Sequence, residues 1–322
     1  HEGYGIVKLP PHLVEDSAFF SPHTMAYQAR NPDDDFIVEP NRVGFATFGG
    51  CINVVDAYTC EIRRATKKDC GEIIRVCDAL DEIGVATRSV NSTDVMEKAQ
   101  SLHNLDAMIR NTGKHIFLGV DSAKSLEAMV DLASASVGGR DLFEKRPIFT
   151  ASVCPISPLT LGNGACEVIM ACARLGVGMV ILPMALSGGT SSASLAGTLV
   201  SHNAEVLSTI VLAQILKKGL PCTYGSTSTI LDLRFGTSAI GSPEYGMINA
   251  SLARIARYYR LPSWVGGGAS DSKEPDIQSG YEFTLSATLS ALSGANIIFG
   301  SGVLEQGMTM DYAKLVMDAE ML

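Results

Sequence analysis

The sequence predicts a (β/α)8 barrel, an α/β fold in which eight parallel strands form a closed ring inside a layer of helices. Short apolar or β-branched runs alternate with helix-length amphipathic segments along the chain. The repeating unit is roughly 30–40 residues long, which fits βαβ repeats. A polar or glycine-rich loop follows each apolar run, which places any chemistry at the carboxyl ends of the strands. A doubly wound open sheet is the competing architecture.

The composition limits the classes of protein to which this chain can belong. Of the 322 residues, 46% are apolar and only 18% are charged, as in a well-buried globular protein. A net charge of -9 argues against a nucleic-acid partner and against an anionic membrane surface. No apolar run reaches the roughly 18 residues that span a bilayer. A cytoplasmic protein that binds neither nucleic acid nor membrane is therefore expected. A homo-oligomer is expected as well.

The chain contains eight cysteines and no C-x-x-C pair. Most of them stand in apolar surroundings, which is typical of small core residues in a reducing compartment. No metal site, structural zinc or disulfide framework is expected.

The elements follow in order. Residues 1–42 are predicted to be an irregular segment wrapped on the barrel, because prolines recur there and an acidic run follows. Residues 43–322 form the predicted catalytic barrel. Its strands are expected at 43–47, 85–89, 115–120, 148–153, 178–183, 221–226, 262–265 and 296–300.

Helices are predicted between these strands. Apolar residues recur at helical spacing from Ile73 to Ile83, for example. Ser242-Pro243-Glu244 is a helix-start signal, and Asp276 is a plausible N-cap. The expected helices cover about 69–83, 95–108, 122–135, 163–175, 192–217, 243–260, 277–292 and 308–320.

The stretch from Val265 to Glu282 combines a strand end, three successive glycines and a polar loop. Gly267 and Gly268 carry no side chain, so a ligand can approach the backbone closely. Asp271 and Lys273 follow. These two residues are candidates for a general acid–base pair, or for a salt bridge at the rim of the loop.

Four aromatic residues lie at predicted strand ends and form a candidate substrate site: Phe48, Tyr224, Trp264 and Phe299. Converging on one mouth, they would make a cage for a cation, although ordinary barrel packing explains the same spacing. His202 and Glu205 share one helical face but lack further metal ligands, so a hydrogen-bonded structural histidine is favoured. His202 remains a candidate substrate contact and Glu205 a candidate catalytic group.

Longer motifs then resemble the trimethylamine methyltransferase family, in order, from about residue 8 to the end. Near the start these are Leu9-Pro10-Pro11 and Ala29-Arg30-Asn31-Pro32. Later ones include Asn203-Ala204-Glu205-Val206-Leu207, Tyr224-Gly225-Ser226, Ser242-Pro243-Glu244-Tyr245, Gly267-Gly268-x-Ser270-Asp271-Ser272-Lys273 and Gly302-x-Leu304-Glu305.

The resemblance implies a barrel enzyme that moves a methyl group from a methylated amine to the cobalt of a corrinoid carried by a separate protein. The chain itself would bind no cofactor tightly. Family members are usually longer at both ends, so this chain resembles the barrel core of a longer protein. Trimethylamine-specific members carry pyrrolysine, which the resemblance places near Gly268 or Ala269. Only standard residues stand there, which implies the branch that demethylates quaternary amines such as glycine betaine.

The chemistry of such a substrate fits the residues. A quaternary ammonium has no N–H to donate and is held by aromatic faces. Its amine departs neutral, so the protein mainly positions an N–CH3 bond in line with cobalt. Gly266, Gly267 and Gly268 would keep the floor of the barrel mouth open for this approach. A barrel lyase or aldolase that uses Lys273 and Asp271, and a non-catalytic betaine-binding module, remain the alternatives.

Overall fold

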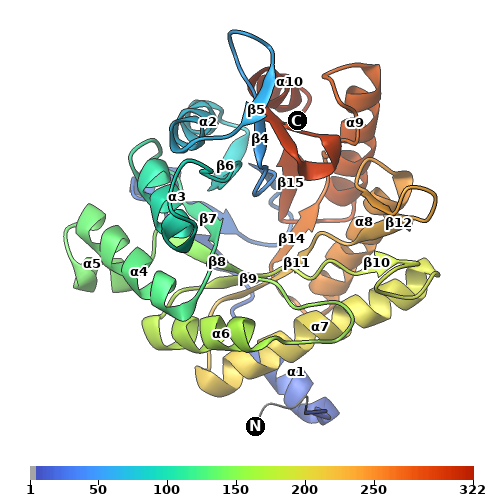
Figure 1. Ribbon diagram of the computed structural model, residues 1–322. Helices are drawn as coiled ribbons and strands as arrows, with labels where there is room; N and C mark the ends of the chain where they lie inside the picture. Colours follow the sequence, from blue (N-terminus) through green and yellow to red (C-terminus); the bar gives the residue numbers. More distant parts are fainter. Residues whose placement is uncertain (1–4) are drawn as a thin grey trace.

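The computed structural model, described for residues 5–322, contains a closed ring of eight parallel strands (Figure 1). The strands follow one another around the ring in chain order, so the predicted (β/α)8 barrel is confirmed and the open sheet is excluded. Trp264 lies beside Ile297 and Ile297 beside Gly44, and the register shifts once in each pairing that β3 makes, with β15 and with β6. The ring consists of β3 (Gly44–Thr47), β6 (Ile83–Thr87), β7 (Ile116–Gly119), β8 (Phe149–Val153), β9 (Met179–Ile181), β11 (Cys222–Ser226), β14 (Ser263–Gly266) and β15 (Ile297–Ser301).

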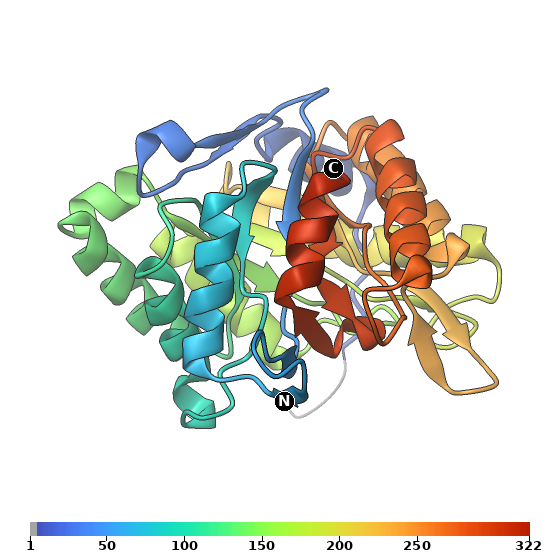
Figure 2. The ribbon, with the colours of Figure 1, turned by 90° about the horizontal axis from the view of Figure 1, so that it is seen from above.

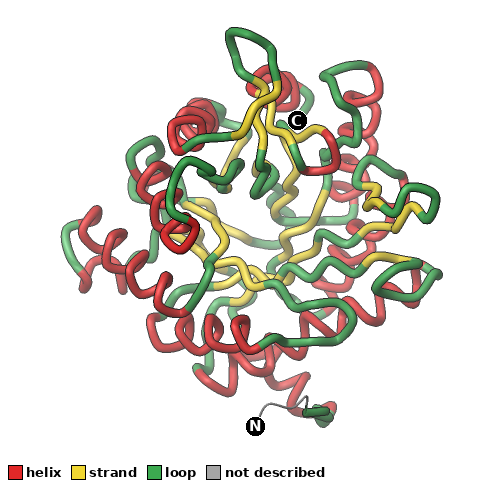
Figure 3. The backbone as a smooth tube through the Cα atoms, in the orientation of Figure 1, coloured by secondary structure: helices red, strands yellow, loops and turns green. Residues whose placement is uncertain are grey.

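Helices surround the ring on the outside, as the tube of Figure 3 shows in red around yellow. The N-caps predicted from sequence are confirmed, since the Ser242 and Asp276 side chains accept hydrogen bonds from the first turns of their helices. The helices that follow the strands are α2 (Lys67–Ala79), α3 (Gln100–Ile109), α4 (Ala123–Val137), α6 (Asn163–Leu175), α7 (Leu195–Leu216), α8 (Pro243–Tyr258), α9 (Ile277–Leu292) and α10 (Tyr312–Glu320). Two short elements, η2 (Glu97–Ala99) and α5 (Arg140–Lys145), add to this layer.

The N-terminal segment is more regular than the sequence suggests. It contains helix α1 (Pro11–Phe20), strand β1 (Met25–Tyr27), the 3-10 turn η1 (Pro32–Asp34) and strand β2 (Phe36–Val38). Helix α1 packs on α7, and β1 pairs antiparallel with β2. The expectation of an irregular path is therefore wrong, because prolines stand at element ends, where a missing N–H costs little.

The β1–β2 hairpin lies across the amino-terminal end of the barrel. Figure 2 shows this hairpin in blue, at the end opposite the orange hairpin of β12 (Thr229–Asp232) and β13 (Thr237–Ala239). The buried Tyr27 donates or accepts a 2.7 Å hydrogen bond with Thr223 Oγ1, and its ring meets Trp264 edge to face. The amino-terminal end of the barrel is thus closed by a side chain from outside the ring.

Short strands that the sequence reading missed frame the other end. One sheet has the order β16-β17-β4-β5, and a second has the order β10-β12-β13. The predicted helix 308–320 begins later than expected, because residues 309–311 form β17 beside β4. These strands are β4 (Asn53–Val55), β5 (Ile62–Arg64), β10 (Leu186–Ser187), β12 (Thr229–Asp232), β13 (Thr237–Ala239), β16 (Val303–Leu304) and β17 (Thr309–Asp311), with the turn η3 (Glu305–Gly307) between the last two.

Helix α7 is the one described helix whose length and composition would qualify it for a membrane span, among residues 5–322. It packs against α1, α6 and α8 in the outer layer of the barrel, and half of its apolar window is buried. The apolar side chains of α7 therefore serve to pack this helix against its neighbours. The cytoplasmic location stays a prediction.

Candidate active site

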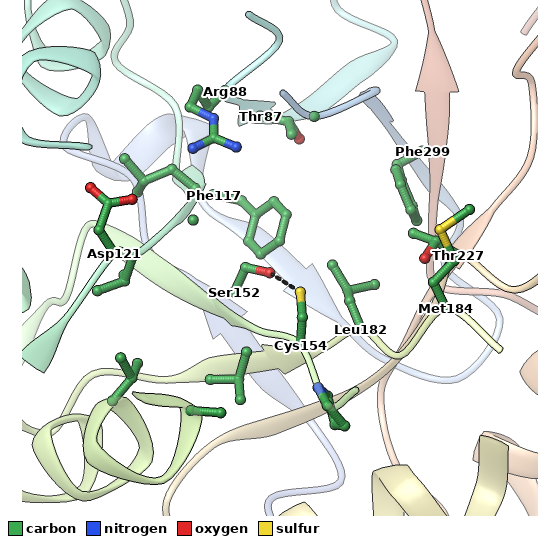
Figure 4. A pocket seen from close by; sticks show the side chains of 18 of the residues that line it. Thr87, Arg88, Phe117, Asp121, Ser152, Cys154, Leu182, Met184, Thr227 and Phe299 are labelled. Atoms are coloured by element: carbon green, nitrogen blue, oxygen red, sulfur yellow. Dashed lines mark hydrogen bonds between the residues drawn. The ribbon is translucent and has the colours of Figure 1, made fainter. Parts of the chain in front are cut away.

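A cavity of about 580 Å³ opens at the carboxyl-terminal mouth of the barrel. Its walls come from the ends of β6, β7, β8 and β15 and from the loops that follow β3, β9 and β11. Figure 4 shows Arg88 and Asp121 on one side and Phe299, Met184 and Thr227 on the other. This is the end at which barrel enzymes carry their chemistry.

Phenylalanine rings make the apolar part of the wall. Phe48 and Phe299 stack with centroids 5.9 Å apart and planes at 26°, and both line the cavity. Phe117 lines it as well. Trp264 lies fully buried within the barrel, 4.5 Å from Phe117 and 6.2 Å from Phe299 between centroids. Two of the four predicted aromatics therefore face one cavity, and Trp264 supports them from within the barrel core.

Tyr224 does not belong to this cavity. Its ring packs beside His202, and its hydroxyl donates a 3.1 Å hydrogen bond to Asn203 Oδ1 on α7. The neighbouring Thr223 points into the barrel, where it meets Tyr27. Successive side chains of a strand face opposite sides, so Tyr224 must point outward toward the helices. Tyr224, predicted as a substrate contact, therefore lies in the helix layer and does not line this cavity.

His202 and Glu205 are buried in the same outer layer. The ring nitrogens of His202 lie 2.9 Å from Ser228 Oγ and 3.0 Å from the Gly225 carbonyl oxygen. Burial lowers the pKa of His202 to about 3, so the ring is neutral. Neither residue lines the cavity, and His202 has the structural role that the sequence analysis favoured.

The Glu205 carboxylate anchors the loop that follows β8. It accepts hydrogen bonds of 2.8 Å from Ser157 Oγ and from the Leu159 N–H. This loop continues from Cys154 and Pro155, which line the cavity. Glu205 thus acts on the site through a loop, at a distance from any bound ligand.

The glycine loop after β14 is closely packed. A side-chain carbon at Gly266 would meet the Tyr245 hydroxyl, and one at Gly267 would lie 2.8 Å from Ile298. One at Gly268 would lie 2.7 Å from the Phe283 ring of α9. Residues 266–270 are all buried. The missing side chains let the loop pack on its neighbours, so the idea of an open floor made by these glycines is wrong.

Asp271 and Lys273 stand apart from the cavity and from each other. Asp271 accepts a 3.1 Å hydrogen bond from the Ile240 N–H. Burial, with a contribution from the nearby Glu282 carboxylate, raises the pKa of Asp271 to about 6. Lys273 is exposed and forms no ion pair within residues 5–322. Neither the predicted acid–base pair nor the predicted salt bridge forms.

The sequence reading missed several polar residues that do line the cavity. Thr87 ends β6 and Arg88 follows it, and Asp121 lies after β7. Ser152 belongs to β8 and Cys154 follows that strand, with Ser152 Oγ 3.4 Å from Cys154 Sγ. Polar or charged residues that directly follow a predicted barrel strand were the available signal. In the part of the chain that the structure describes, no three His, Cys, Asp or Glu side chains gather as metal ligands.

Comparison with known proteins agrees with this architecture. The profile of the trimethylamine methyltransferase (MTTB) family matches residues 3–322. The chain belongs to the trimethylamine methyltransferase family. It is 46% identical, over 98% of its length, to a trimethylamine methyltransferase of Desulfitobacterium hafniense strain DSM 10664 / DCB-2. It is 39% identical, over 99% of its length, to that of Methanosarcina barkeri.

The family also includes a relative with a different named substrate. A glycine betaine methyltransferase of Desulfitobacterium hafniense strain Y51 is 31% identical over 98% of this chain and 66% of the relative. This chain spans only 64% and 65% of the two trimethylamine methyltransferases. Relatives named for both substrates are therefore present, with higher identity to the trimethylamine enzymes.

Solved structures confirm the fold of this family member. The monomethylamine methyltransferase of Methanosarcina barkeri superposes with a TM-score of 0.65 at 14% identity, over 98% of this chain and 67% of that one. A dihydropteroate synthase of Coxiella burnetii gives a TM-score of 0.54 at 12% identity, over 92% and 96% of the two chains. At such identities the likeness concerns the barrel alone.

Proposed function

We propose that this chain is the barrel of a methyltransferase that takes a methyl group from a tertiary or quaternary methylated amine. The acceptor is the cobalt(I) of a corrinoid carried by a separate protein. Membership of the trimethylamine methyltransferase family supports methylated amines as substrates. The phenylalanine-lined cavity at the barrel mouth is the observation that carries the proposal.

The cavity fits such a substrate in two respects. The stacked pair Phe48 and Phe299, with Phe117 nearby, offers π faces to a methylated ammonium, each worth about 1–2 kcal/mol when water is excluded. Asp121 is the one carboxylate among the residues that line the wall, and it accepts a hydrogen bond from the Ser101 N–H. When a quaternary ammonium, or a tertiary amine that already carries a proton, gives its methyl group to cobalt(I), the N–C bond electrons remain on the amine, which leaves neutral. The chain then has to orient the N–CH3 bond rather than transfer a proton.

The test mixes the chain with a reduced cobalt(I) corrinoid protein and a methylated amine, and follows formation of methyl-cobalt by absorption spectroscopy. Methylation that requires both the amine and this chain is the expected result. Binding of the amine without any methylation would instead support a non-catalytic binding module.

The aldolase alternative has its own assay. A lyase or aldolase that uses Lys273 would form an imine with a carbonyl substrate, and borohydride would fix it to that lysine. We expect no such adduct, because Lys273 is exposed and lies away from the cavity. Mass spectrometry of a borohydride-treated sample would reveal a modified Lys273 peptide if the aldolase interpretation is right.

A further inference from the structure

A second cavity, of about 340 Å³, lies at the amino-terminal face of the barrel, beside the β1–β2 hairpin. Its walls come from the starts of β14 and β15, from the carboxyl-terminal ends of α8 and α9, and from the chain on either side of the hairpin. Within residues 5–322, no residue lines both this amino-terminal cavity and the cavity at the mouth. Its volume is that of a small-molecule site.

Two arginines give the amino-terminal cavity a positive wall. Arg257 lies in the last turn of α8 and Arg260 shortly after that helix, and both are exposed residues that line the cavity. Within residues 5–322 neither forms an ion pair, and Arg257 Nη2 donates a 3.3 Å hydrogen bond to the neutral Asn41 side chain. Glu39 has the one carboxylate among the residues that line the cavity. Two guanidiniums that share a cavity repel each other, so the cavity favours an anion.

The backbone at Arg260 has a conformation that glycine adopts more easily. Arg260 has a φ of +57°, and the Leu261 N–H that follows it donates a 2.9 Å hydrogen bond to the Ala256 carbonyl oxygen. This is the Schellman helix end, in which the left-handed residue is usually glycine. An arginine within the last helical turn would complement the helix dipole without this strain, so the strain at Arg260 points to a function of its side chain. The same motif ends α4, α6 and α9 with glycine at the equivalent position: Gly138, Gly176 and Gly294.

The rest of the cavity leaves the arginine heads free to bind. A side-chain carbon at Gly294 would lie 2.9 Å from Arg257 Nη1, so the glycine makes room for that guanidinium. The polar groups of the floor are paired with one another. Ser263 Oγ donates a 3.2 Å hydrogen bond to Asn296 Oδ1, and Asn296 Nδ2 donates a 2.9 Å hydrogen bond to the Glu39 carbonyl oxygen. The guanidiniums therefore present the N–H donors that a ligand can use.

A phosphate group matches this wall. It carries a charge of about −1.5 to −2 near neutral pH, and guanidinium groups bind its oxygens in bidentate geometry. Leu261 and Ala253 border the same cavity and can contact an apolar part of a ligand. We propose that Arg257 and Arg260, beside His23, form an anion site that binds a phosphate group at the amino-terminal face of the barrel. A phosphate bound there links the N-terminal segment to the end of α8.

Calorimetric titration of the full chain with inorganic phosphate tests the site, with acetate at matched ionic strength as the comparison. Phosphate should bind at least about tenfold more tightly than acetate, because a dianion meets two guanidiniums. It should also raise the melting temperature, as a ligand that binds only the folded state does. Absence of phosphate binding, or equal affinity for phosphate and acetate, would overturn the proposal.

Phenyl phosphate distinguishes two sources of the phosphate group. Tighter binding of phenyl phosphate than of inorganic phosphate would support a phosphate ester as the ligand, because the apolar side chains would bury the ring. Equal binding of the two would support free phosphate. Both results support the site itself.

Variants assign phosphate binding to the two arginines. Arg260→Gly should weaken phosphate binding at least about tenfold, yet its melting temperature without phosphate should equal or exceed that of the parent, because glycine adopts the left-handed conformation without strain. Arg257→Gln should weaken binding to a similar extent. Arg254→Gln is the matched control, because Arg254 is exposed on the same helix and does not line the cavity. Unchanged phosphate affinity in Arg260→Gly would contradict the assignment.

Arg88 offers phosphate another guanidinium, in the wall of the mouth cavity. Arg88→Met should leave phosphate affinity unchanged, because Arg88 does not line the amino-terminal cavity. Loss of phosphate binding in Arg88→Met, with retention in Arg260→Gly, would place the anion at the mouth and overturn the proposal. Methyl transfer to cobalt concerns the mouth cavity alone, so the phosphate titration and the methyl-transfer assay can fail separately.

Discussion

The cavity wall is divided between two kinds of side chain. The stacked rings of Phe48 and Phe299 come from opposite ends of the chain and meet at the mouth because β3 and β15 are neighbours in the ring. Arg88, which directly follows β6, lies across from them and forms no ion pair within residues 5–322. The proposed recognition of a methylated amine therefore depends on particular residues at strand ends rather than on the barrel as such.

Substitution of Phe299 tests the aromatic wall. Phe299→Leu keeps an apolar side chain but removes the π face, so affinity for a quaternary ammonium ligand should fall about fivefold to thirtyfold, equivalent to about 1–2 kcal/mol. Calorimetric titration with choline measures this change. Phe235→Leu is the control, since Phe235 is exposed between β12 and β13. Unchanged affinity in Phe299→Leu would mean that the Phe299 ring does not contact the bound ligand.

Asp271 gives a pH-dependent prediction. Its folded-state pKa of about 6 lies above the ordinary value of 3.8. The folded state therefore binds the proton more tightly than the unfolded state, and this contribution to stability is lost as pH rises from about 4 through 6. Asp271→Asn removes the charge, so it should stabilise the chain at pH 8 by about 1 kcal/mol after allowance for partial solvent screening, with no gain at pH 4.

Urea unfolding of the parent and of Asp271→Asn at both pH values measures the effect. Asp232→Asn serves as a comparison, because Asp232 lies in the short accessory strand β12 and accepts a hydrogen bond from the Arg234 N–H. A stability difference between the parent and Asp271→Asn that is the same at pH 4 and pH 8 would contradict a raised pKa.

At the scale of elements, the turn from β14 to α9 is fixed by close packing. Gly268 has a φ of +77° and faces the Phe283 ring, and its amide donates a 2.9 Å hydrogen bond to Ser286 Oγ. Ser290 Oγ donates to the Gly266 carbonyl oxygen at 2.9 Å. The α9 helix thus holds the glycine loop from behind, which explains why the loop is buried rather than exposed at the mouth.

Alanine substitutions in the same region should have opposite effects. Gly268→Ala should lower the free energy of unfolding by about 2 kcal/mol or more, because it adds strain at positive φ and a clash with Phe283. Gly280→Ala should raise it by about 0.5–1 kcal/mol, because Gly280 lies within α9 with no atom near the added carbon. Chemical denaturation of the two variants measures both. An unchanged free energy of unfolding in Gly268→Ala would mean that the loop is open rather than closely packed.

The whole molecule is a barrel closed at one end and open at the other. Tyr27 fills the amino-terminal end through its contacts with Thr223, Trp264 and His115. The cavity occupies the opposite end, and Trp264 lies between them. The N-terminal hairpin is therefore part of the barrel core and supports the floor of the site.

Removal of this closure should affect the entire fold. Tyr27→Ala should cost about 3–5 kcal/mol of stability, as for other buried aromatic residues, whereas Tyr27→Phe should cost about 1 kcal/mol for the lost hydrogen bond. Thermal unfolding measures both. A Tyr27→Ala variant as stable as the parent would mean that the N-terminal hairpin does not contribute to the barrel core.

The sequence by itself determined the barrel. Eight apolar runs appear at the expected spacing because strands buried on both faces need apolar side chains, and helix periodicity and caps are local properties. Helices α6 and α9 begin and end at the residues predicted. Family membership followed from motifs that extend over almost the whole chain. These features depend on neighbours in sequence, so the sequence contains them.

Only the tertiary structure decided which strand-end residues meet. A shift of one position turns a side chain from the barrel interior to the helix layer, which separates Tyr224 from Phe299. Positions 267 and 268 require glycine because a side chain there would collide with neighbouring residues. The residues next to them in the sequence do not indicate this contact. The fold also decides which polar atoms find partners, and within residues 5–322 the buried Arg88 Nε atom has no hydrogen-bond partner. Contacts between distant residues depend on the direction of each side chain and on closure of the ring. The spacing of the strands along the sequence determines neither of these.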